Sequence, residues 1–229
     1  ALNRTNLVIR HAAALGLNVD IGLAEKTKLL LGKPRHVVKH IVSMPWQKAP
    51  NFYQSLDDKS LPQLALRLLM LTGLRSYPVR HAHLDEIDGD IWTIPGEKMK
   101  GRKGKTSDFR VPLTPEALHV IELASQQQPD GHIFPGVKRG VISDASMARL
   151  MERRGLEARP HGFRSTLRVW LTESQQASRE VAETIIAHQT GSITERAYNR
   201  TDFLEQRRKL MEAWERYSKL GDNEHSARE

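Results

Sequence analysis

The chain has 229 residues, a formal net charge of +8, 39% hydrophobic and 27% charged residues, and no cysteine. This length suits one large domain, or one domain and a fragment, and no apolar stretch approaches the roughly 18 residues of a membrane span. Disulfides, thiolate zinc sites and cysteine nucleophiles are excluded, and the positive charge favours a polyanionic partner, either nucleic acid or an anionic membrane surface.

The sequence of the opening segment predicts short helices that are too small to bury a core of their own. Apolar residues recur on one side of a helix over residues 1–15, and a second helix covers 23–31. A further helical turn or two is predicted over residues 36–44. The first residues of the chain lack the charged-then-apolar layout of a signal peptide. We expect this segment to be the closing part of something larger, or a strap on the next domain, and the polar run 47–60 to be a linker.

The strongest helix signal follows this run. Ser60 is a good N-cap, Pro62 falls in the first turn, and the apolar stretch LPQLALRLLMLTGL ends near Gly73. Arg75 comes just after this buried helix. The sequence therefore predicts that the backbone at Arg75 is rigid and holds this charged side chain in a fixed position.

A small sheet comes next. HLDEIDGDIWTIP predicts two strands joined by a glycine-containing turn, and FRVPL predicts a third. The run between the second and third strands is either a solvated charged turn or a cationic finger that faces phosphates. Its basic residues are Lys98, Lys100, Arg102, Lys103 and Lys105.

The rest of the chain is nearly all helical. Thr114-Pro115-Glu116 opens a helix with an N-cap, a proline and a first-turn acid in order. Further helices are predicted at residues 143–154, 161–173, 178–187 and 202–219. The fold class is therefore mainly α with a small three-stranded antiparallel sheet, an α+β arrangement.

One set of residues has the chemistry to act on a phosphodiester. His161 and Arg164 lie three apart and share a helix face, and His188 and Tyr198 follow them. Two arginines, Arg164 and the upstream Arg75, would clamp a phosphodiester and stabilise its extra charge at a five-coordinate phosphorus. Tyrosine is a feasible nucleophile once cations or a histidine help it to lose a proton of pKa about 10.

No metal site is predicted. The chain lacks a cluster of carboxylates of the kind that holds Mg²⁺. His161 and His188 have no third zinc ligand at a usual spacing. We interpret the site as metal-independent.

These motifs resemble the tyrosine recombinases, the phage integrase family. LTGLRSYPVR is similar to the first arginine box, HGFR to the H-x-x-R box, IIAHQTG to the histidine box and AYNR to the tyrosine box. The hairpin lysine followed by FRVPL resembles the family's strand 2–strand 3 turn. The resemblance covers roughly Trp46 to Tyr217, and AYNRTDFLEQRRKLMEAWERY looks like the branch of P4-type phage and genomic-island integrases.

The resemblance implies a role for each matching residue. Tyr198 would attack the scissile phosphate and form a 3′-phosphotyrosyl link, while Arg75 and Arg164 hold the non-bridging oxygens. His161 would be the acid/base for the tyrosine proton. His188 would hydrogen-bond the phosphate or orient its neighbours.

A lysine of the hairpin would protonate the departing 5′-oxygen. Lys100 is our choice because it stands where the family lysine follows the second strand; Lys98 is its rival, and Lys103 and Lys105 are weaker candidates. Since the phosphotyrosine stores the bond energy, no cofactor and no metal is implied.

The resemblance also implies domains and partners. Residues 1–45 would be a helical remnant of a core-binding domain plus linker, 46–222 the catalytic domain and 223–229 a polar tail. The function implied is phage or genomic-island integration and excision, in the cytoplasm of a bacterial host. The partners would be double-stranded attachment-site DNA, a homotetramer formed on DNA from free monomers, and accessory DNA-bending or excision factors, with no membrane.

Two departures from the family pattern stand out. Pro78 occupies the place of the usual carboxylate, so we expect Asp85 or Glu86 to orient Arg75, and Ala187 stands where glycine commonly precedes the histidine. Two other functions remain open. One is nicking and closing of DNA like a type IB topoisomerase, and the other is that of a catalytically silent DNA-binding relic.

Overall fold

The computed structural model describes residues 2–32, 41–101, 104, 106–126, 131–137, 140–188 and 201–220. The chain divides into two compact units, residues 1–40 and 41–229. In the first unit, helix α1 (Leu2–Ala14) packs with helix α2 (Leu23–Leu31), close to the predicted bounds. Leu29 and Leu30 of α2 are 83% and 88% exposed, and Ala24 is the one buried hydrophobic residue among those described in this unit. Two helices this short cannot bury a core of their own.

Two expectations near the start of the second unit are corrected. Residues 41–45 form no helix, and the remainder of the predicted turn at 36–44 lies outside the described residues. The run 47–60 is not a linker, because a 3-10 turn (Trp46–Lys48) leads directly into helix α3 (Ala49–Gln54). Phe52 and Tyr53 of α3 are only 8% and 3% exposed. The apolar surface that these aromatic side chains bury stabilises a packed helix here, although most residues around them are polar.

Helix α4 (Leu61–Thr72) forms the centre of the second unit, as its apolar sequence predicts. Leu64 and Leu68 are fully buried, and neighbouring helices pack on several sides of α4. Gly73 ends the helix with a left-handed backbone (φ 64°), a conformation that glycine adopts without steric cost. A short helix, α5 (Ser76–Arg80), which the sequence did not predict, follows at once. Arg75 therefore lies between two helices.

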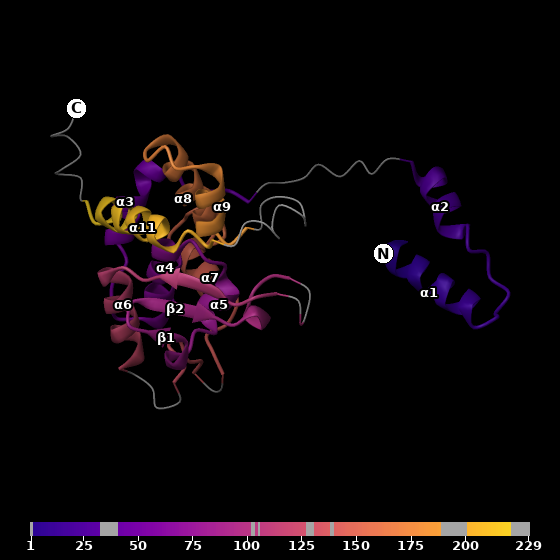
Figure 1. Cartoon of the computed structure of the whole chain (residues 1–229), viewed down its shortest axis with the longest axis horizontal. Helices are drawn as coiled ribbons and strands as arrows, with labels where there is room; N and C mark the ends of the chain where they lie inside the picture. The colour runs from indigo at the N-terminus through magenta and orange to yellow at the C-terminus, as the bar shows by residue number, and fades with distance from the viewer. Residues whose placement is uncertain are drawn as a thin grey trace. The chain divides into compact units, whose positions relative to one another are not determined.

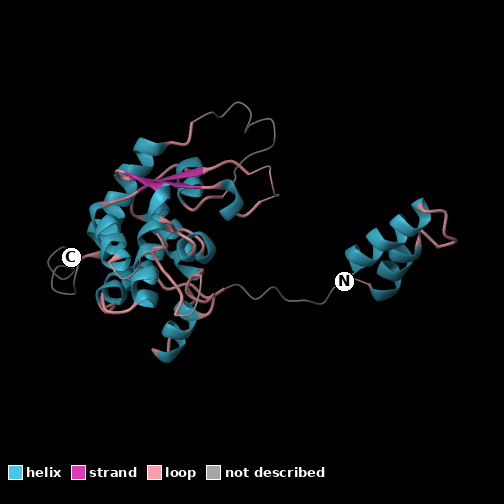
Figure 2. Cartoon of the chain, turned by 90° about the horizontal axis from the view of Figure 1, so that it is seen from below, coloured by secondary structure: helices cyan, strands magenta, loops and turns pink. Residues whose placement is uncertain are grey.

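The predicted three-stranded antiparallel sheet is confirmed. Its strands are β1 (Ile87–Asp88), β2 (Ile91–Ile94) and β3 (Phe109–Pro112), in the order β1-β2-β3. Trp92 lies opposite Ile87 on one neighbouring strand and Val111 on the other, and its side chain is fully buried. The sheet lies toward one side of the second unit, and helices make up the remainder (Figure 2).

The later helices confirm the mainly α class. They are α6 (Pro115–Ser125), α7 (Ser146–Arg153), α8 (Gly162–Glu173), α9 (Arg179–Ile185) and α11 (Leu204–Ser218). Helix α11 packs against α3, α4, α9 and β3, which joins the end of the described chain to its centre (Figure 1). Across the described ranges, none of the helices has the length and apolar character needed to cross a membrane.

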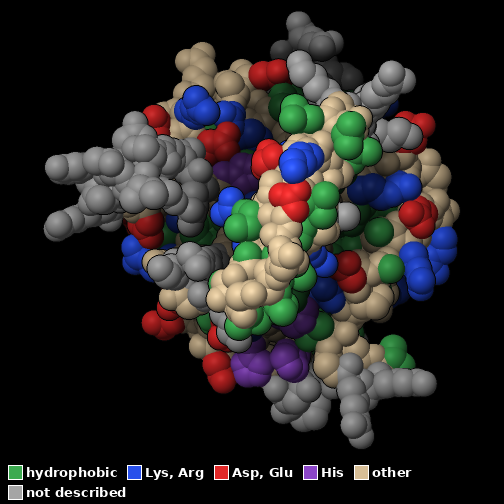
Figure 3. All heavy atoms as spheres, turned by 90° about the vertical axis from the view of Figure 1, so that its right-hand side faces the viewer, with side chains coloured by type: hydrophobic (Ala, Val, Ile, Leu, Met, Phe, Trp, Pro, Cys, Tyr) green, Lys and Arg blue, Asp and Glu red, His purple; other side chains and the backbone are tan. Residues whose placement is uncertain are grey.

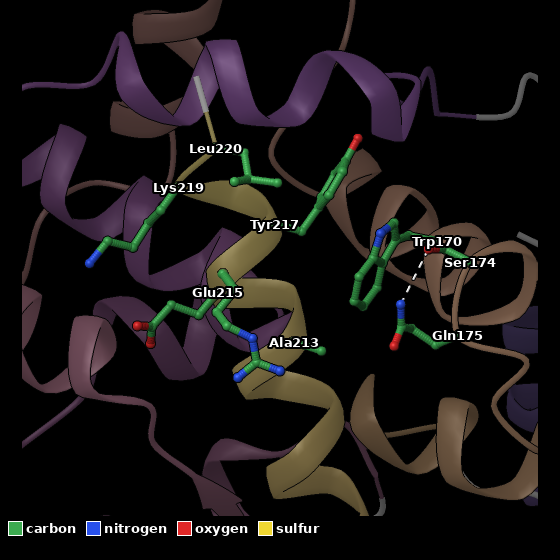
Figure 4. A pocket seen from close by; sticks show the side chains of 9 residues that line it. Trp170, Ser174, Gln175, Ala213, Glu215, Tyr217, Lys219 and Leu220 are labelled. Carbon is green, nitrogen blue, oxygen red and sulfur yellow. Dashed lines mark hydrogen bonds between the residues drawn. The ribbon is translucent and has the colours of Figure 1, made fainter. Parts of the chain in front are cut away.

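A cavity of about 640 Å³ lies beside the C-terminal half of α11. Figure 4 shows Trp170 and Tyr217 on one side of it and Lys219 on the other, and a hydrogen bond of 3.2 Å joins Gln175 to Ser174 at its edge. The cavity is lined by residues of α8 and α11 and of the segments that follow them, and by none of the five predicted catalytic residues that the structure describes. It is therefore separate from those five residues.

Candidate active site

Arg75 is the N-cap residue of α5, directly after the buried α4. Its Nη1 donates a hydrogen bond of 3.4 Å to the carbonyl oxygen of Ala187, just past the end of α9. Burial lowers the pKa of the guanidinium. The expectation that Asp85 or Glu86 orients Arg75 is therefore wrong, because a main-chain carbonyl contacts it instead.

Arg164 lies in the first turn of α8 and is only 3% exposed. Its Nη1 donates to the carbonyl oxygen of Gly73 at 2.8 Å, and its Nη2 donates to that of Ile186. Burial, together with the nearby Arg75, lowers the pKa of Arg164 to about 10. The side chain still carries a full positive charge at neutral pH, with neutral carbonyls as hydrogen-bond acceptors.

His161 precedes α8 and lies among the other predicted residues. Loss of surrounding water lowers the pKa of its imidazole first, and the charges of Arg164, Arg75, His188 and Lys100 lower it further. These four side chains come from separate parts of the sequence and all act on this one ring. The structure therefore brings together five of the six predicted residues, in surroundings that favour the uncharged form of His161.

His188 lies three residues beyond the last residue of α9. Its Nδ1 is 2.9 Å from Oε2 of Glu183, whose Oε1 accepts a 2.8 Å bond from Nε of Arg168. Burial would raise the pKa of Glu183, but the hydrogen bonds from Arg168 and His188 outweigh it and lower that pKa. Glu183 and Arg168 were not among the sequence candidates.

The two candidate lysines have different surroundings. Lys98 is paired with the carboxylate of Glu86 and donates a 2.6 Å bond to the carbonyl oxygen of His81. Lys100 is exposed, acts on His161, and makes no hydrogen bond or ion pair with the residues that the structure describes. This difference favours Lys100, while Lys103 and Lys105 lie outside the described residues.

Tyr198 also lies outside the described residues, which stop at His188 and resume at Thr201. The chain is anchored where it resumes. Asp202 pairs with Arg110 of β3 at 2.7 Å, and the buried Arg207 donates to the carbonyl oxygen of Arg110, also at 2.7 Å. Strand β3 itself follows the hairpin that carries the lysines.

On the face drawn in Figure 3, Lys and Arg side chains are interspersed with Asp and Glu side chains. Among the described residues, no group of three or more His, Cys, Asp and Glu side chains is placed to hold a metal ion.

The fold is that of a tyrosine recombinase catalytic domain. The integrase of mycobacterium phage Brujita superposes with a TM-score of 0.59 at 20% identity, over 97% of this chain and 73% of that one. A lambda integrase dimer bound to a COC′ core site gives a TM-score of 0.54 at 14% identity, over 74% of this chain and 69% of that one.

The model of the phage integrase family matches residues 43–205, and the chain belongs to this family. Prophage integrase IntZ of Escherichia coli (strain K12) is 32% identical over 76% of this chain and 44% of its own length. The integrase of Enterobacteria phage P4 is 27% identical over 82% of this chain and 47% of its own length. The chain thus spans about half the length of the curated relatives it matches.

Proposed function

We propose that this chain is the catalytic part of a site-specific DNA recombinase that cuts and rejoins strands through a 3′-phosphotyrosyl intermediate. The observation that carries the proposal is the gathering of Arg75, Lys100, Arg164 and His188 around His161. The cations of this cluster outnumber Glu183, the carboxylate that contacts His188, so the net charge of the cluster suits a phosphodiester. The relatives are integrases, which favours recombination over simple nicking and closing of DNA.

In this proposal the arginines bind the non-bridging oxygens of the scissile phosphate. Arg164 has two of its nitrogens bonded to carbonyls of Gly73 and Ile186, which hold the plane of its guanidinium. Arg75 is held more loosely by Ala187. Fixed donors of this kind stabilise developing negative charge without having to reorganise during the reaction.

Proton transfer falls to three other residues. His161, whose lowered pKa favours the uncharged ring, accepts the proton of Tyr198 as the phenolic oxygen attacks phosphorus. Lys100 gives a proton to the departing 5′-oxygen. His188 donates a hydrogen bond to the phosphate. The phosphotyrosyl link then keeps the energy of the broken bond, so rejoining needs no nucleotide.

The proposed partner is double-stranded attachment-site DNA, within a complex of four copies in the bacterial cytoplasm. In support, solved lambda integrase structures include a dimer bound to a COC′ core site and a tetramer bound to a Holliday junction. Integration and excision, with accessory DNA-bending factors, belong to the same proposal. Because cationic side chains would contact phosphates, DNA affinity should fall linearly with salt on a logarithmic plot.

The test is covalent trapping on DNA that is nicked near the cleavage site. The chain and its Tyr198→Phe variant are incubated with such duplexes without metal, and adducts resistant to detergent are counted. We expect an adduct from the chain and none from the variant. If the chain binds cognate DNA and yet forms no adduct, the proposal is overturned for this chain.

A further inference from the structure

The side chain of Glu183 lies between His188 and Arg168 and contacts both. Its two carboxylate oxygens are divided between them, with Oε2 at 2.9 Å from Nδ1 of His188 and Oε1 at 2.8 Å from Nε of Arg168. Glu183 is 19% exposed, against 45% for His188. The carboxylate is thus the inner partner, and the imidazole is the outer one.

The end of α9 explains why residues five apart can meet. The helix stops at Ile185, and Ala187 takes a left-handed backbone with φ 50°. The chain then turns back, so the N–H of His188 donates a 2.9 Å bond to the carbonyl oxygen of Glu183. This is the bond pattern of a Schellman helix end. His188 is therefore bonded to Glu183 twice, once through the backbone and once through the side chain.

The ionisation state of Glu183 decides where the proton of His188 lies. A carboxylate only accepts hydrogen bonds, so Nδ1 must carry the hydrogen that it donates to Glu183. Within the described residues, Nε2 of His188 has no hydrogen-bond partner. The ring therefore has one nitrogen engaged by the protein and one left for a ligand.

We propose that Glu183 is a positioning residue that holds a proton of His188 on Nδ1, so that Nε2 is left to face the phosphate and, on taking up a second proton from solvent, donates the hydrogen bond to it. This inference rests on the proposed function. Carboxylates fix the tautomer and orientation of functional histidines in this way in many enzymes. Arg168 completes the arrangement, because it binds the second oxygen of Glu183 and favours the ionised form that burial would otherwise disfavour.

The first test is a mutant cycle on the rate of covalent trapping. Glu183→Gln should slow the adduct about tenfold to a hundredfold, which corresponds to one hydrogen bond between charged groups. The same substitution should have no further effect in a His188→Ala background, because Glu183 acts through that ring. Glu180→Gln is the matched control, since Glu180 is an exposed acid on the same helix. A Glu183→Gln rate equal to that of this control, or an undiminished effect without His188, overturns the inference.

The second test needs no DNA and no activity. Nitrogen-15 NMR distinguishes the two neutral tautomers of an imidazole, and the His188→Ala spectrum identifies the His188 signals. We expect the Nδ1–H form in the unmodified chain and a shift toward Nε2–H in Glu183→Gln. A ring protonated on Nε2 alone in the unmodified chain overturns the inference. If the chain forms no adduct at all, the proposed function fails, and this spectrum still decides whether Glu183 positions His188.

Discussion

Two arginines of the second unit, the partly buried Arg67 and the buried Arg164, have opposite surroundings. Arg67 of α4 pairs with the carboxylate of Glu116 at 2.5 Å, and Glu116 also accepts hydrogen bonds of 2.9 Å from Tyr53 and Lys219. Arg164 of α8 instead donates to the carbonyls of Gly73 and Ile186. Burial would lower the pKa of both guanidinium groups. At Arg67 the bonds to Tyr53 and Glu116 outweigh it and raise that pKa, whereas at Arg164 no such partner prevails.

Arg67 is a structural cation, whereas the surroundings of Arg164 suit a cation that binds an anion. The charge of Arg67 is cancelled by its own protein, so this arginine joins α4 to α6 and, through Lys219, to the end of α11. The hydrogen bonds of Arg164 go to neutral carbonyls, and the nearby carboxylate of Glu183 only partly offsets its charge. Since burying a charge without a counter-ion is costly, such an arrangement is typical of a site that a ligand completes.

The largest expected effect follows from replacing Arg164 by lysine. A lysine cannot hold two carbonyls and a phosphate in one plane, so the trapping rate should fall by at least about a hundredfold. Arg67→Lys is the control, because it keeps the charge beside Glu116 and lies in the structural pair. Equal trapping rates for the two variants would show that the surroundings of Arg164 have no catalytic meaning.

Next comes Glu116→Ala, which leaves Arg67 buried without its carboxylate. Removing one partner of a buried ion pair destabilises a protein by about 3–5 kcal/mol, so the midpoint of urea unfolding should fall accordingly. Glu122→Ala changes an exposed acid on the same helix and should have little effect. An unchanged midpoint for Glu116→Ala would mean that the pair adds nothing to the fold.

The third prediction uses pH. The pKa of His161 lies below its ordinary value of 6.5, so more than half of this base is still uncharged at pH 6.5. The trapping rate should therefore decline on the acid side with a midpoint below 6.5. His161→Gln should be slow and lack this acid limb. A midpoint above 6.5 for the unmodified chain would contradict the role of the cations around His161.

The smallest effect is expected at Ala187. Its φ of 50° costs a residue with a Cβ about 1–2 kcal/mol, and a more flexible unfolded chain offsets part of the gain from glycine. Ala187→Gly should stabilise the chain by up to about 1 kcal/mol in thermal or urea unfolding. Ala148→Gly, within α7, should destabilise it by a similar amount. A loss of stability at both positions would show that Ala187 is not strained.

Much of the fold could be predicted because its signals are local. Ser60, Pro62 and Gly73 mark the ends of α4, and Thr114 and Pro115 mark the start of α6. The linker predicted over residues 47–60 was wrong. Polar residues outnumber aromatic ones in this run, but Phe52 and Tyr53 are buried, and their burial decides that the segment packs as a helix. Helix α5 was missed because five residues are too few for a periodic pattern.

Part of the candidate site could likewise be predicted from the sequence, and part could not. Spacing alone put His161 and Arg164 on one helix face, and the motifs supplied Arg75, Lys100 and His188. Nothing in the sequence showed that Lys98 pairs with Glu86, since that contact depends on how the hairpin lies against the 3-10 turn before β1. Glu183 could have been found only from the turn at Ala187, because residues five apart do not share a face on a continuous helix.

The sequence by itself determined most of the longer helices, the small sheet and the identities of the candidate residues, because capping, periodicity and motif spacing act over a few residues. The tertiary structure alone decided what each cation is paired with. Arg67 meets a carboxylate 49 positions away, and Arg164 meets a carbonyl 91 positions away. Contacts of that range follow from packing around α4, and they decide which charge is cancelled and which is left for a ligand.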